Sequence, residues 1–82
     1  MKEYIVKTTT INLENLNTMI TFIGKDGYVH DEIKYADGWK RKHFAEQYIE
    51  NDIKCTWNKK IDDRHCIESG KWLHHYEIIK KD

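Results

Sequence analysis

Apolar residues follow strand-like patterns at both ends of the chain. Near the N-terminus, the apolar run Tyr4-Ile5-Val6 precedes three β-branched threonines, which predicts a strand over residues 3–10 that is buried on both faces near the centre of a sheet. Residues 72–80 alternate, so Trp72, His74, Tyr76 and Ile78 would share one face and Leu73, His75, Glu77 and Ile79 the other. The face that carries Trp72 is the better candidate for the core.

The pattern between residues 12 and 24 fits two structures. Leucine and isoleucine recur at helical spacing, with Asn12 as a possible N-cap and Gly24 as a possible residue after the helix. Residues 18–23, however, are rich in β-forming residues, and Lys25-Asp26-Gly27 is a hairpin-turn sequence that leads into residues 28–30. We favour the hairpin and keep the helix as the alternative.

A helix is expected within residues 39–51, after Asp37-Gly38 closes the strand region. At about 100° per residue, Phe44, Ala45, Tyr48 and Ile49 fall on one arc, and His43, Glu46, Gln47 and Glu50 fall opposite. Residues 53–57 resemble the start of a strand, residues 59–64 a charged loop, residues 65–67 a short strand, and Ser69-Gly70 a turn. The expected fold is α+β: a small antiparallel β-sheet with one main amphipathic helix packed on one face, in a single domain over residues 1–82.

The amino-acid composition indicates that the chain folds and has no formal net charge. Leu, Ile, Val and Phe make up about 22% of the 82 residues, just above the ~20% below which disorder is expected, and three Trp and five Tyr enlarge the core. The 14 Lys and Arg balance the 14 Asp and Glu. Nucleic-acid binders usually carry a basic excess and DNA mimics an acidic one, so a protein partner is the leading class.

Targeting and catalytic signals are missing from the sequence. No stretch reaches ~18 apolar residues, and no signal-peptide apolar region follows the first residues, so we expect a cytoplasmic protein with no membrane partner. The four glycines are scattered turn residues and form no phosphate-binding loop. We therefore expect no enzymatic activity and no catalytic residues.

Cysteine and histidine could in principle form a metal site. The candidates are Cys55, His65, Cys66, and His74 or His75. Structural zinc sites usually present ligands in close pairs separated by a tight turn. Here the neighbouring pairs would point to opposite faces of a strand, so we expect neither a metal nor a cofactor, and two reduced cysteines.

The best candidate for a binding surface is Trp39-Lys40-Arg41-Lys42-His43. If the helix includes Trp39, its ring lies away from the apolar arc and would be an exposed binding anchor. If Trp39 instead precedes the first turn, its ring tucks under the sheet and the lysines are ordinary solvated charges. Both readings stay open from the sequence.

The segments at residues 24–28, 38–51 and 72–79, with twelve Lys against two Arg, resemble the small accessory proteins encoded by phages and other mobile elements. That group includes anti-CRISPR and other anti-defence inhibitors. The resemblance implies a non-catalytic module that occupies a surface of a larger host enzyme in the host cytoplasm. The alternatives are a nucleic-acid-binding domain that uses Lys40, Arg41 and Lys42, and a homodimer joined by a sheet edge.

Overall fold

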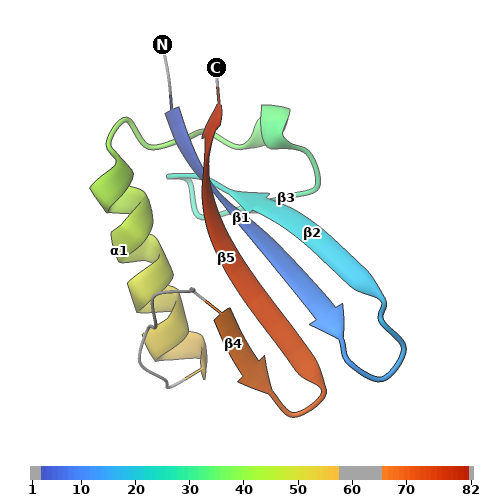
Figure 1. Cartoon of the computed structure of the whole chain (residues 1–82). Helices are drawn as coiled ribbons and strands as arrows, with labels where there is room; N and C mark the ends of the chain where they lie inside the picture. The colour runs from blue at the N-terminus through green and yellow to red at the C-terminus, as the bar shows by residue number, and fades with distance from the viewer. Residues whose placement is uncertain (1–2, 58–65, 82) are drawn as a thin grey trace.

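The computed structural model describes residues 3–57 and 66–81 (Figure 1). In chain order the elements are β1 (Glu3–Asn12), β2 (Thr18–Ile23), β3 (Val29–His30), the 3-10 turn η1 (Ile33–Tyr35), α1 (Lys42–Asp52), the π-helical segment η2 (Ile53–Trp57), β4 (Cys66–Ser69) and β5 (Trp72–Lys81). The described strands form one antiparallel sheet in the order β3-β2-β1-β5-β4. The predicted α+β class with a small antiparallel sheet is confirmed.

Strand β1 is the centre of the sheet. It pairs with β5 along its whole length, from Glu3 opposite Lys81 to Asn12 opposite Trp72, and with β2 on its other side. Ile5 and Val6 point to opposite faces and are both fully buried. The predicted strand that is buried on both faces is therefore confirmed.

The register divides the sheet into two faces. Val6, Ile23 and Ile78 lie opposite one another, and Tyr76 follows on the same side, which we call the Val6 face. The core cluster joins residues of this face to residues of the helical segments and β4: Val6, Ile23, Ala45, Ile49, Ile53, Ile67 and Tyr76. The predicted core face of β5 is confirmed at Tyr76, which is only 1% exposed, but the prediction is wrong at Trp72, which is 41% exposed at the end of the strand.

Residues 12–24 form a hairpin arm, and the helical alternative is wrong. The β1–β2 turn is held by the Asn12 side chain, which accepts a hydrogen bond from the Glu14 N–H, and Leu16 adopts a positive φ of 62°. In the β2–β3 turn, Asp26 accepts the N–H of Tyr28, and Gly27 has a φ of 77°. Local β propensity and turn chemistry decide this segment.

Helix α1 begins at Lys42, inside the range in which a helix was expected. Trp39 is held in an extended conformation by a two-way backbone bridge to Tyr4, with N···O distances of 2.7 and 2.9 Å. Ala45 and Ile49 are buried, and Tyr48 is half-buried. The prediction is wrong at Phe44, which is exposed with its ring stacked near that of His43.

The predicted strand start at residues 53–57 is also wrong. The chain continues from α1 as η2, because Ile53 extends the buried row of Ala45 and Ile49 into the core. The short strand near Cys66 is confirmed as β4, and Gly70 forms the predicted turn with a φ of 58°. His65 and the charged segment 59–64 lie outside the described residues.

Candidate functional site

Trp39 is the structural support of the predicted binding cluster. Its ring centroid lies 5.6 Å from that of Tyr48, and its side chain packs against the core cluster. Its backbone pairs with Tyr4 of β1. Trp39 therefore fixes the chain where it enters α1, which matches the reading in which it precedes the first helical turn.

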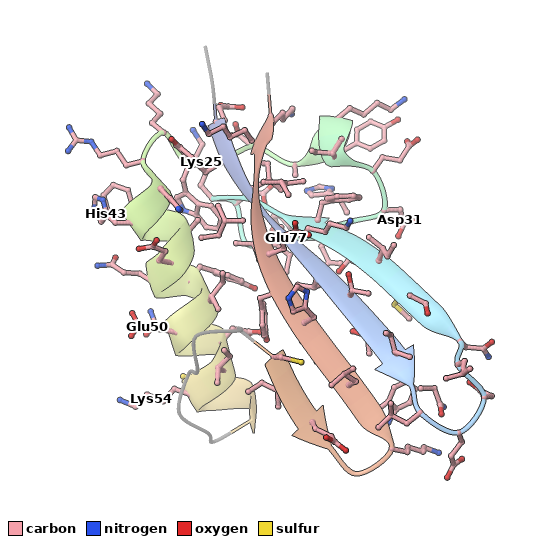
Figure 2. The ribbon with its side chains drawn as sticks, viewed as in Figure 1. Lys25, Asp31, His43, Glu50, Lys54 and Glu77 are labelled. Atoms are coloured by element: carbon pink, nitrogen blue, oxygen red, sulfur yellow. The ribbon has the colours of Figure 1, made fainter. Side chains whose placement is uncertain are left out.

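The four residues after Trp39 are exposed. We call Lys40, Arg41, Lys42 and His43 the basic segment. Figure 2 shows His43 projecting from the start of α1, away from the sheet. Within the part of the chain that the structure describes, Lys40, Arg41 and Lys42 have no ion-pair partner. The basic segment thus presents its positive charge to solvent.

The backbone at the start of α1 adds to this positive potential. Arg41 is the N-cap residue with extended dihedral angles, its side chain makes no capping hydrogen bond, and the first turn contains no acidic residue. The N-terminal end of a helix carries a partial positive charge, so cations there cost roughly 0.3–1 kcal/mol each. Such an arrangement favours anionic groups as contacts.

A second polar cluster, which sequence reasoning missed, joins β5 to the end of α1. The Tyr76 hydroxyl donates a hydrogen bond to Asp52 Oδ2, and His74 Nδ1 lies 2.6 Å from Thr10 Oγ1. The rings of His74 and Tyr76 meet edge to face at 4.8 Å. Alternation along β5 predicts that His74 and Tyr76 share a face, but no local signal identifies Asp52 as the partner.

This cluster sets the ionisation of two side chains. Burial lowers the pKa of His74, an effect that the Asp52 carboxylate opposes and His75 reinforces. Burial raises the pKa of Tyr48, and Asp52 adds to this increase. The Thr10 hydroxyl is one hydrogen-bonding partner of the His74 ring. The cluster favours a neutral His74 at the margin of the core.

The predicted metal-ligand candidates are spread over different elements and faces. Cys55 is exposed on η2, while Cys66 is half-buried on β4 opposite His75. His74 lies opposite Ile67 and therefore on the other face from Cys66. Among the described residues, no three His, Cys, Asp or Glu side chains gather as a metal site. His65 lies outside these residues.

Exposed apolar side chains gather at the hairpin end of the sheet. This end lies opposite the two termini in Figure 1, and the Leu13 N–H donates to the Lys71 carbonyl, which joins the two hairpin loops. The exposed side chains are Leu13, Leu16, Met19, Ile20 and Trp72. The sequence analysis did not identify this group, and it placed Trp72 on the core face of its strand.

Comparison with known proteins gives no relative. No family model matches the chain, and no curated protein or solved structure is significantly similar to it. In the described part of the chain, no helix is both long and apolar enough to cross a membrane. The basis for a function is therefore the chain's own surface.

Proposed function

We propose that the chain is a non-enzymatic protein-binding module whose contact surface is the basic segment, residues 40–43. In this proposal α1 is an amphipathic helix packed on one face of the sheet, and Trp39 anchors its start. The observation that carries the proposal is the exposure of consecutive cationic residues that lack an ion-pair partner among the described residues. A monomer gains nothing from this concentration of charge at a helix N-terminus.

The chemistry of the surface defines the partner. Because the whole chain has a formal net charge of zero, its positive potential is local, and a partner needs an acidic patch of similar size. Phe44 adjoins the basic segment and is 46% exposed, so an apolar contact can sit beside the charges. An acidic patch beside an apolar pocket is the complementary surface.

The resemblance to phage accessory proteins suggests which partner to test first. We propose a host enzyme or complex of defence or nucleic-acid processing in the cytoplasm, which the module inhibits by occupying a surface. Enzymes that bind nucleic acids are themselves largely basic, so their acidic regulatory or metal-binding surfaces are the complementary targets.

Charge reversal tests the basic segment. The parent chain, R41E, K42E and K54E would each be immobilised and exposed to host lysate, and captured proteins measured quantitatively. A specific partner should be retained by the parent, and its retention should fall about tenfold or more in R41E and K42E. K54E changes the same charge on exposed η2 and should bind like the parent. Recovery of no partner, or equal capture by all variants, would overturn the proposal.

Nucleic acid is a second candidate, favoured by one observation. The uncapped start of α1 leaves backbone N–H groups beside three cationic side chains, an arrangement that suits phosphate. Mobility shifts with single- and double-stranded DNA and RNA at low and moderate salt test this candidate. Phosphate binding must weaken steeply as salt rises. The absence of any shift at low salt would remove it.

A further inference from the structure

Strand β2 has a partly open edge. Strand β3 pairs only with its last two residues, Phe22 opposite His30 and Ile23 opposite Val29. Residues 18–21 pair with β1, and the described residues provide no strand on their other side. In Figure 1 this part of β2 forms the outer margin of the sheet. Its outward backbone groups are available to another strand.

The side chains of this open edge do not prevent pairing. Residues 18–21 have the sequence Thr-Met-Ile-Thr, with no charge and no proline. Met19 is 64% exposed on the Val6 face, and Ile20 is 44% exposed on the other. Natural edge strands usually carry lysine, proline or a bulge against association. Here two apolar side chains flank the open backbone instead.

The other edge of the sheet is different. Strand β4 is four residues long, carries the charged Glu68, and contacts η2. Its Ile67 is buried in the core cluster. The combination of an unpaired edge, exposed apolar side chains and no charge is therefore found at residues 18–21 and not at β4.

We propose that a second copy of this chain pairs antiparallel with residues 18–21, so that one sheet continues across a two-fold axis. In such an interface each row of side chains meets the same row of its partner. Any charge in the row would face a like charge, and residues 18–21 contain none. The zero net charge adds no long-range repulsion between copies.

The geometry of the fold permits this pairing. A two-fold axis perpendicular to the sheet keeps corresponding faces on the same side, so Met19 can lie opposite Met19 of the second copy, with Thr18 opposite Ile20. Helix α1 contacts β1 and β5, on the far side of β1 from the open edge (Figure 1), so the two helices stay apart. Because β3 occupies the edge from Phe22 onward, the interface is short and the dimer weak.

Sedimentation equilibrium tests the proposal over about 10 µM to 1 mM, the range where weak association is measurable. The parent should show a monomer–dimer equilibrium. M19K and I20K place like charges across the axis and should weaken dimerisation at least about tenfold. F44K introduces the same charge at an exposed apolar residue of α1 and should dimerise like the parent.

Circular dichroism would establish that each variant is folded, and an unfolded lysine variant would be replaced by M19T or I20T, which keep β propensity and remove the apolar contact. Loss of dimer in these variants, with F44K unaffected, supports the open edge as the interface. A parent chain that stays monomeric at about 1 mM overturns the proposal, and so does a dimer that M19K and I20K leave unchanged.

Discussion

The two margins of the sheet differ in how much of their apolar surface is buried. At the β4 margin, Ile67 enters the core with Ile49 and Ile53 from the helical segments. At the β2 margin, only Ile23 reaches that core, while Met19 and Ile20 remain exposed. Among the described residues, α1 contacts β1 and β5, so buried apolar contacts are concentrated on that side of the sheet and accessible apolar surface on the other.

The same charged substitution should have the most different effects on the two margins. I67K would bury an unpaired ammonium group in the core cluster, at a cost of several kcal/mol that is comparable to the whole stability of a small domain. M19K should change the free energy of unfolding of dilute protein by less than about 0.5 kcal/mol. Urea unfolding followed by circular dichroism measures both. Similar losses would show that the β2 margin is also part of the core.

Truncation of isoleucine to alanine should also destabilise the core more than the β2 margin, with smaller losses in the free energy of unfolding than I67K. I49A removes a fully buried side chain of α1 and should lower the free energy of unfolding by about 2–5 kcal/mol. I20A removes the same atoms at the open margin, where water already reaches the side chain, and should cost less than about 1 kcal/mol. Thermal and urea unfolding of both variants give the comparison, which fails if I20A is the more damaging change.

Removal of a tyrosine hydroxyl should also lower stability more at β5, next to the end of α1, than beside β3. Y76F removes the donor to Asp52 that joins β5 to the end of α1, and should cost about 1–3 kcal/mol. Y28F alters an exposed ring beside β3 and should be neutral within about 0.5 kcal/mol. Equal stabilities of Y76F and the parent would contradict a contribution from the Tyr76–Asp52 bond.

Acid should lower the stability of the fold through His74. Because the pKa of His74 is lowered in the folded chain, the unfolded chain binds this proton more readily, and stability falls as pH drops below the ordinary value of 6.5. The contribution is fully present above 6.5 and is lost toward the lower folded pKa. Urea midpoints between pH 5 and 8 should fall with acid in the parent, and less steeply in H74Q. An identical slope in H74Q would exclude His74 as a source of this dependence.

The parts of the fold that were predicted from sequence depend on local patterns. The run at residues 4–6, the alternation at residues 72–80, and the turn at residues 25–27 each lie within a few residues, and the corresponding elements are present. The exact start of α1 stayed open because it depends on a backbone bridge between Trp39 and Tyr4, which are far apart in sequence. The β-branched character of residues 53–57 was outweighed by burial of Ile53.

The candidate binding surfaces also differ in how far they could be predicted from the sequence. Residues 40–43 were predicted from their polar character, but the partial burial of Trp39 depends on its contacts with Tyr4 and Tyr48, which the sequence does not show. The open edge of β2 could not be predicted, because it results from the shortness of β3. Strand length is decided by how the chain leaves the sheet toward η1, and no residue type encodes that path by itself.

Residue-resolved amide hydrogen exchange by NMR, at low and high protein concentration, tests the difference between the two margins most directly. The outward amides of residues 18–21 should exchange rapidly in dilute solution and become protected as concentration rises, while those of residues 66–69 keep the same exchange rates. Strong protection of residues 18–21 in dilute monomer, or concentration-dependent protection at residues 66–69 alone, would contradict an open β2 margin that serves as the association edge.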